Sequence, residues 1–153
     1  MKKQNNAYFA GNFDGEGCIY MKPHNAGWRL VASVSACHYP VLEYYQFTFK
    51  GYTRLKPAAK NKTMWEWSIH KQSDLKLFLD SILPYSIEKA DQIQLGTDWL
   101  HLRSKYPRNK VPKELIEYGK KVSDQLKALK KISYSPIAVH PGFPLLELQS
   151  SRL

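Results

Sequence analysis

The sequence predicts an α+β fold in which helices cover one face of a curved, four-stranded antiparallel sheet. Two pairs of segments alternate apolar and polar residues, 18–24 with 28–37 and 52–56 with 64–70, and each pair is joined by a loop. Helical patterns precede, separate and follow these hairpins. The predicted order of elements is therefore αββαββα with additional C-terminal helices.

The first helix, at 7–17, combines small residues with acidic ones. Phe9 and Phe13 share one side of the helical wheel and are expected to enter a core. A glycine inside a helix costs about 1 kcal/mol relative to alanine, so the presence of Gly11 and Gly15 in this helix requires an explanation. A smooth stripe lets a second helix pack closely, and we expect a dimer interface made of Ala7, Ala10, Gly11, Asp14 and Gly15.

The later elements follow from capping and breaking residues. A helix is expected from Pro40 to about Thr48, another begins at 73–74 and ends before Pro84, a longer one runs over 86–104, and the last begins at Pro112. The proline-rich, apolar tail from 132 is expected to lie over the body or contact a partner. We interpret 1–153 as a single domain with its core at about 7–104 and a C-terminal helix and tail at 105–153.

Composition favours an acidic partner. The net charge is +10 and the pI is about 9.6. No apolar run approaches the roughly 20 residues of a membrane-spanning helix, and no signal peptide opens the chain. Cys18 and Cys37 lack metal-ligand spacing, and we expect both to be reduced thiols in the core. The expected location is intracellular, in the cytoplasm, the nucleoid or an organelle matrix.

Residues 9–17 resemble the signature motif of the LAGLIDADG homing endonucleases. The second, third, sixth and ninth letters of that motif are identical here, at Ala10, Gly11, Asp14 and Gly17. Glu16 replaces the catalytic aspartate, and Asn12 replaces a leucine. The order of elements from 7 to about 102 is also similar to that family. A single motif in the chain implies a homodimer by this resemblance.

The resemblance also implies a divalent-metal site. Glu16 is the implied catalytic metal ligand, with the Gly15 carbonyl as a second ligand and Mg²⁺ or Mn²⁺ as the ion. Two Glu16 carboxylates in a dimer would repel one another without a cation between them. Lys89 matches a family lysine near the scissile phosphate, and His38 matches a polar residue that positions water. Asp14 resembles an acid that is structural at the helix interface.

The outward face of the sheet is the expected DNA-contacting surface, because a two-stranded ribbon fits the major groove. Its polar and basic side chains are Tyr20, Lys22, His24, Arg29, Val31, Ser33, Ser35, Arg54, Lys56, Glu66, Ser68 and His70. Cations in loops are expected to contact phosphates, which position the protein without specifying sequence; they are Lys60, Lys62, Arg108 and Lys110.

The resemblance therefore implies a homodimeric endonuclease that hydrolyses double-stranded DNA at a long pseudo-palindromic site with a divalent metal. A non-cleaving DNA- or RNA-binding protein on the same scaffold, such as an intron maturase or a transcriptional regulator, is the alternative. The carboxylate at Glu16 favours the enzyme. A membrane-surface protein is disfavoured because no helix is strongly amphipathic and basic. No small-molecule cofactor beyond the metal is expected.

Overall fold

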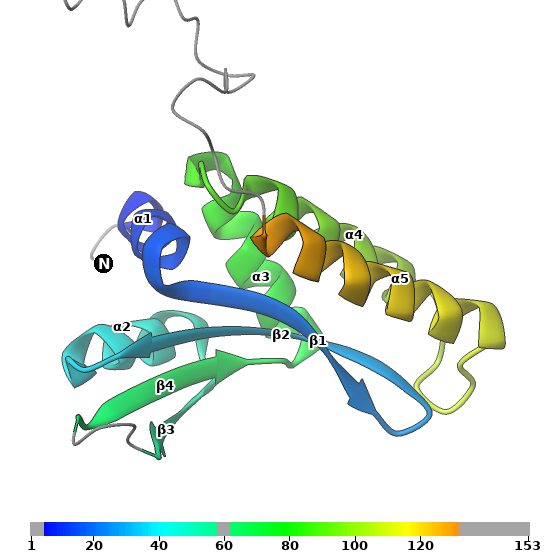
Figure 1. Ribbon diagram of the computed structural model, residues 1–153, viewed down its shortest axis with the longest axis horizontal. Coiled ribbons are helices and arrows are strands. Elements are labelled where there is room, and N and C mark those ends of the chain that lie inside the picture. Colours follow the sequence, from blue (N-terminus) through cyan, green and yellow to red (C-terminus); the bar gives the residue numbers. More distant parts are fainter. Residues whose placement is uncertain (1–4, 58–61, 132–153) are drawn as a thin grey trace, which may run out of the picture.

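The structure, a computed structural model, describes residues 5–57 and 62–131. The helices and strands follow one another along the chain (Figure 1) as α1 Asn6–Glu16, β1 Gly17–His24, β2 Gly27–Ala36, α2 Tyr39–Phe49, β3 Tyr52–Lys56, β4 Met64–Ile69, α3 Gln72–Ile82, the 3₁₀ turn η1 Leu83–Tyr85, α4 Ala90–Ser104 and α5 Lys113–Lys130. The strands form one antiparallel sheet in the order β1-β2-β4-β3. The predicted α+β fold and element order are confirmed.

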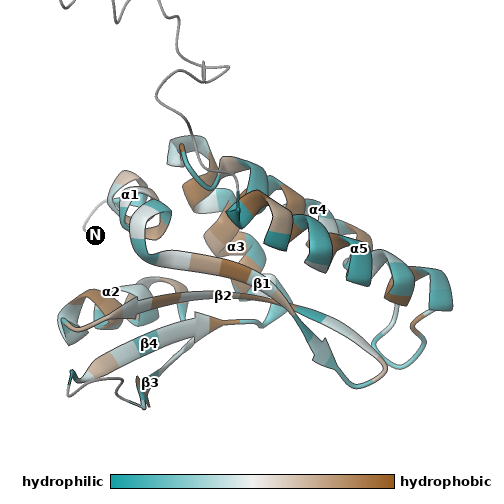
Figure 2. Ribbon diagram, viewed as in Figure 1, coloured by the Kyte–Doolittle hydropathy of each residue, from teal (hydrophilic) through white to brown (hydrophobic). Residues whose placement is uncertain are grey.

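The core lies between the sheet and the helices. Figure 1 shows α1, α3, α4 and α5 on one side of the sheet, with the other side uncovered. The predicted alternation holds, since Ile19, Ala32 and Trp67 face the helices with at most 1% of their surface exposed. Figure 2 shows hydrophobic residues gathered in β1, α3 and α4, where helices and sheet meet. Burial of this apolar face is the main stabilising contribution.

Aromatic rings fix α1 and α2 to the sheet. Phe9 packs edge-to-face on Tyr45 at a centroid distance of 4.8 Å, and Tyr45 lies 4.8 Å from Trp67. Phe13 meets Phe78 of α3 at 5.2 Å, also edge-to-face. Such pairs add about 0.5–1.5 kcal/mol each beyond area burial. The predicted core side of the first helix is therefore correct.

The two hairpins are paired over only part of their length. β2 pairs with β1 from Gly27 to Val34 but with β4 only from Ala32 to Ala36. The chain leaves β4 after Ile69 and turns into α3. The β1–β2 hairpin therefore extends past β4, and 27–31 of β2 have a strand on one side only.

Several local expectations need correction. α4 begins at Ala90 and not at Ser86, because the backbone of 87–89 donates hydrogen bonds to Asp14 instead of continuing a helix. Cys37 is exposed and Cys18 half-buried, both as free thiols. The tail from 132 lies outside the described residues. None of the described helices is long and apolar enough to cross a membrane.

Candidate nucleic-acid interface and metal site

The two acids of α1 point in different directions. Asp14 is 9% exposed, and its carboxylate accepts hydrogen bonds from the backbone N–H groups of Ile87, at 2.7 Å, and of Lys89, at 3.2 Å. The Lys89 ammonium also donates to the Asp14 carbonyl oxygen. Asp14 therefore ties α1 to the start of α4 within one chain. Its carboxylate faces its own chain, and the place of Asp14 in a dimer interface stays a prediction.

Glu16 is exposed at the last position of α1. Within 5–57 and 62–131 its carboxylate makes no hydrogen bond or ion pair, which leaves both oxygens accessible to a ligand. Gly15 is also exposed, and its carbonyl is one of the last four of the helix, which lack an intrahelical donor. The structure therefore places a carboxylate and a backbone carbonyl together at this helix end.

Lys89 and His38 differ in how closely they approach Glu16. Lys89 is held against Asp14, two residues before Glu16. His38 is exposed immediately before α2, and its side chain makes no capping hydrogen bond. It follows the end of β2, which lies beside the start of β1 because Val34 pairs with Gly17. The structure thus brings Lys89 to the acidic end of α1. His38 lies at the end of the sheet where α1 joins β1.

The donor atoms fit a hard cation. Among the described residues, no three His, Cys, Asp or Glu side chains gather into a metal site. The oxygens of Glu16 and Gly15 are of the type that magnesium and manganese prefer, and magnesium commonly uses one or two carboxylates with water and phosphate as further ligands. One chain would supply part of such a site and would leave the remaining positions to other oxygen donors.

An exposed stripe of small residues runs along α1. Ala7, Gly11 and Gly15 are exposed, and a methyl group built at either glycine meets no atom within 4 Å. Ala10 is fully buried, so its predicted place in the interface is wrong. The reason is its position one turn before Asp14, on the flank that faces the sheet and α3. The available stripe is narrower than predicted, with members spaced four residues apart.

The strand register places the predicted DNA-contacting residues on one face. Lys22 is opposite Arg29, Tyr20 is opposite Val31, and Glu66 lies between its partners on β2 and β3. Antiparallel partners point to the same side of a sheet. This is the side that Figure 1 shows uncovered by helices.

The side chains of this face differ in accessibility. Lys22, His24 and Arg54 are exposed, whereas Tyr20, Arg29, Ser35, Lys56 and His70 are half-buried. Four others are almost fully buried and do not present themselves to a base edge, contrary to expectation; they are Val31, Ser33, Glu66 and Ser68. The two serines are short and are cross-strand partners of each other, with Cys18 on the far side of Ser33 and Tyr52 on the far side of Ser68. The alternation in the sequence correctly predicted on which face of the sheet these side chains lie, but not how deeply each one is buried.

Glu66 organises the cations of this face. Its Oε1 accepts hydrogen bonds from Arg54 Nε at 3.0 Å and Nη2 at 2.7 Å, and its Oε2 lies 3.1 Å from Lys56 Nζ. Lys56 also donates to Ser35 Oγ at 3.1 Å. Burial raises the pKa of Glu66, but the hydrogen bonds from Arg54 and Lys56 outweigh it and hold that pKa below its ordinary value. A charged Glu66 therefore fixes two cations in place.

Two residues that contribute to this face escaped the sequence prediction. Tyr52 is 45% exposed and meets the His70 ring edge-to-face at 5.8 Å; its alternation with Arg54 and Lys56 was the signal for it. Lys130 at the end of α5 reaches Cys18 Sγ at 3.1 Å and lies 5.9 Å from the centre of the Tyr20 ring. No sequence pattern links residues this far apart.

No sequence-family model matches this chain, and no curated protein does. Solved structures do match it. The homing endonuclease I-CvuI in complex with its target is 22% identical over 86% of this chain and 85% of its own, with a TM-score of 0.67. The archaeal intron-encoded homing endonuclease I-Vdi141I complexed with DNA is 15% identical over 95% and 92%, with a TM-score of 0.68.

A third match differs in length. The LAGLIDADG meganuclease I-AabMI bound to uncleaved DNA is 18% identical over 98% of this chain, which covers only 50% of that protein, with a TM-score of 0.60. The element order and the sheet of this chain belong to the fold that these matches share. The chain has the fold of the LAGLIDADG homing endonucleases.

Proposed function

We propose that this protein is a homodimeric, sequence-specific endonuclease that hydrolyses phosphodiester bonds of double-stranded DNA with Mg²⁺ or Mn²⁺. The observation that carries the proposal is the exposed, unpaired carboxylate of Glu16 beside the anchored Lys89. A carboxylate that serves the fold has partners, as Asp14 does. Glu16 has none among the described residues, which suits a ligand for a metal and a substrate.

The exposed stripe on α1 supports the homodimer. Ala7, Gly11 and Gly15 allow a second α1 to approach closely, since nothing in the chain fills the space above the glycines. Such a contact would place two Glu16 residues at one helix-pair end. This chain also matches nearly the full length of I-CvuI and I-Vdi141I but half of I-AabMI. One chain then supplies half of a two-fold site.

The chain's own residues divide the chemistry between them. Glu16 and the Gly15 carbonyl would hold the metal, which supplies water activation and stabilisation of the leaving oxygen when bound. Lys89 places a positive charge near the phosphate, and its ammonium is restrained by the Asp14 carbonyl. His38 would orient water by hydrogen bonding. Because Lys89 is held by the fold, little reordering of its side chain is needed when substrate binds.

The outer face of the sheet supports DNA as the partner. Lys22 and Arg29 are cross-strand neighbours, and Arg54 and Lys56 are aligned by Glu66, which gives the face ordered donors. I-CvuI and I-Vdi141I are complexed with DNA in their structures. Arginine and lysine side chains donate to guanine in the major groove.

Cleavage of a randomised plasmid library, with and without Mg²⁺ and with sequencing of the ends, tests the proposal. We expect double-strand breaks at one pseudo-palindromic site. Glu16→Gln should abolish cleavage while keeping the dissociation constant within about tenfold, roughly 1.4 kcal/mol. Glu117→Gln, an exposed glutamate of α5, is the matched control and should cleave normally. Full cleavage by Glu16→Gln would remove Glu16 from the mechanism. Specific binding without cleavage would identify a regulator or a maturase instead.

A further inference from the structure

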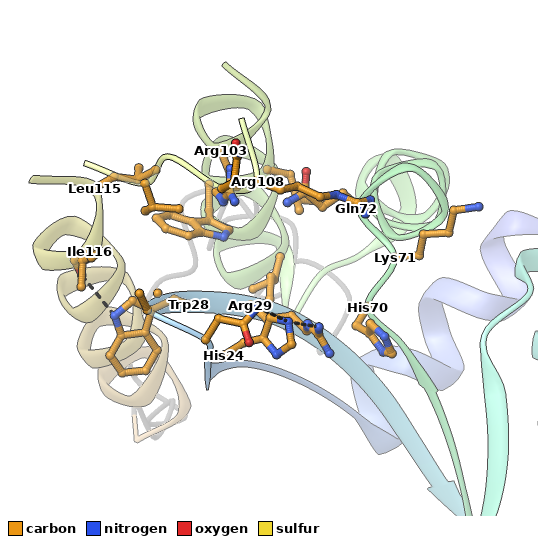
Figure 3. Close-up of a pocket in the computed structure, with 18 residues that line it drawn as sticks. His24, Trp28, Arg29, His70, Lys71, Gln72, Arg103, Arg108, Leu115 and Ile116 are labelled. Atoms are coloured by element: carbon orange, nitrogen blue, oxygen red, sulfur yellow. Dashed lines mark hydrogen bonds between the residues drawn. The ribbon is translucent and has the colours of Figure 1, made fainter. Parts of the chain in front are cut away.

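A pocket of about 800 Å³ lies where the β1–β2 hairpin extends past β4. Four segments far apart in the sequence form its walls: the hairpin tip, the link from β4 to α3, the end of α4 and the loop before α5. Figure 3 shows side chains from all four directed toward a common space. The cationic or titratable ones are His24, Arg29, His70, Lys71, Arg103 and Arg108.

The walls of the pocket are held by the fold. Trp28 of β2 donates from Nε1 to the Ile116 carbonyl of α5 at 3.1 Å (Figure 3), which joins the hairpin tip to the last helix. Gly119 packs against the same indole, because a Cβ there would lie 2.5 Å from its Cδ1. Trp99 and Leu115, which also line the pocket, are almost fully buried. The pocket is therefore a fixed feature of the described chain.

The charge of the pocket is unbalanced. No aspartate or glutamate lines it. Arg29, Arg103 and Arg108 form no ion pair within 5–57 and 62–131, and only Lys71 has a distant one, to Asp74 at 3.9 Å. A guanidinium has five N–H donors, and Arg103 uses one on the Tyr106 carbonyl at 2.9 Å. Most donors of the three arginines are therefore free for an anion.

The pKa of His70 reflects the same excess of positive charge. Burial, then the nearby Arg29, His24 and Lys22, hold the pKa of His70 below its ordinary value. Arg29 also makes a hydrogen bond to His24 Nε2 (Figure 3), in which the guanidinium donates. The positive charges of the lining therefore repel one another. A bound anion would reduce this repulsion.

We propose that this pocket binds a backbone phosphate of duplex DNA, outside the base pairs that the outer face of the sheet contacts. The proposal rests on the proposed function, since it takes the sheet to lie along DNA. His24, Arg29 and His70 belong both to the outer face and to the pocket, so a strand that follows the sheet passes directly to it. Arginine forks match the geometry of phosphate oxygens.

The strand length sets where this phosphate lies. β1 has 8 residues between the metal end at Gly17 and the pocket at His24. At about 3.3 Å per residue this is roughly 23 Å. A DNA strand rises about 3.4 Å per base pair, so the pocket reaches a phosphate about seven base pairs from the metal site. This contact would add affinity without reading sequence.

The test compares Arg103→Gln and Arg108→Gln with Lys120→Gln, which removes one charge from the exposed face of α5 outside the pocket. On a random-sequence duplex of about 30 base pairs, each pocket variant should lose about fivefold in affinity and lower the salt slope by about 0.9. Lys120→Gln should change neither. Equal effects of all three variants, or no effect of any, would overturn the proposal.

Two further experiments distinguish a DNA phosphate from free phosphate as the occupant of the pocket. They also distinguish a failure of this inference from a failure of the proposed function. In ¹⁵N NMR, inorganic phosphate should shift the arginine side-chain N–H signals of the wild type and not those of Arg108→Gln. If these shifts occur but the pocket variants leave the salt slope of DNA binding unchanged, the pocket binds free anions and the DNA contact is overturned. On the cleaved site, a methylphosphonate about seven base pairs from the scissile bond should weaken the wild type and leave Arg108→Gln unaffected. The random-duplex result stands even if no site is cleaved.

Discussion

Lys89 contacts Asp14 at two points, through its backbone N–H to Oδ1 at 3.2 Å and through its ammonium to the carbonyl oxygen. The same carboxylate accepts from Ile87, so one acid of α1 satisfies several donors that precede α4. A negative charge at a helix N-terminus is also favourable. Under the proposed function, the motif therefore carries Asp14 for the fold and Glu16 for a ligand.

The first prediction concerns Asp14. Asp14→Ala leaves partly buried backbone donors without their carboxylate acceptor, and it should lower the free energy of unfolding by about 1.5–3 kcal/mol, the range for hydrogen bonds to charged groups. Asp14→Asn keeps one acceptor and should lower it by less. Urea denaturation measures both. Glu16→Gln is the control and should leave the midpoint unchanged, while an Asp14→Ala midpoint equal to the wild type would contradict the structural role.

Gly11 separates folding from dimer formation. A leucine at Gly11 points into open space in the single chain, so Gly11→Leu should fold normally but form monomers, because the side chain blocks close helix approach. Light scattering measures the mass, and circular dichroism checks the fold. Gly17→Ala provides a contrast, since its Cβ would lie 2.2 Å from Phe13 Cδ2 and should destabilise each chain. An unchanged mass for Gly11→Leu would refute the helix-pair interface.

Glu66 should make stability depend on pH. Its folded pKa lies below the ordinary 4.5, so its contribution to stability is present above that pH and is lost as the pH falls through the folded value. We expect the wild type to exceed Glu66→Gln in the free energy of unfolding at about pH 7, and the difference to narrow toward about pH 3. Chemical denaturation at a series of pH values measures it. A constant difference would show that Arg54 and Lys56 do not act through the charge of Glu66.

Arg54 should contribute sequence specificity. Nε and Nη2 are engaged by Glu66, which leaves the remaining N–H groups to contact a base. Arg54→Ala should therefore relax discrimination at one base pair of the target by about 1–3 kcal/mol. Binding to a set of single-substitution duplexes measures it. If affinity falls equally for every duplex, Arg54 contacts a phosphate instead.

Asn12 has a structural reason for departing from the motif. The buried Tyr45 hydroxyl lies 2.9 Å from Asn12 Oδ1 and 3.1 Å from the Phe9 carbonyl, and burial raises the pKa of Tyr45. Asn12→Leu should lower the free energy of unfolding by about 1 kcal/mol, because one acceptor of the shared proton is lost. A double-mutant cycle with Tyr45→Phe measures the coupling. An equal effect of Asn12→Leu in both backgrounds would show that the two side chains act independently.

The fold was predictable from sequence because its determinants are local. Alternation over five to ten residues specifies which side of each strand is buried, and Phe9 and Phe13 specify the core side of α1. Burial depth on the outer face was not predictable, because Ser33 and Ser68 are paired with each other and have a further strand on their other sides, an arrangement that depends on the packing of all four strands. A helical wheel likewise grouped Ala10 and Asp14 with the exposed stripe, although tertiary packing divides them from it.

The candidate site was predictable where the motif is contiguous and not where it is assembled. Glu16 and Gly15 follow from nine consecutive residues. The start of α4 was misplaced because Asp14 competes for its backbone donors, a contact across more than seventy residues. The basic pocket escaped detection for the same reason, as its four walls are brought together only by the packing of the hairpin tip against α4 and α5.

The overhang of β2 beyond β4 has an evolutionary consequence. At Arg29 the strand has a neighbour on one side only, whereas at Ser33 it is paired on both. An exchange at the overhang alters what the hairpin presents without disturbing a second row of backbone pairing, but an exchange at Ser33 must suit three strands at once. Under the proposed function, target preference can therefore change at the hairpin tip during evolution, whereas the central sheet is constrained by its pairing on both sides.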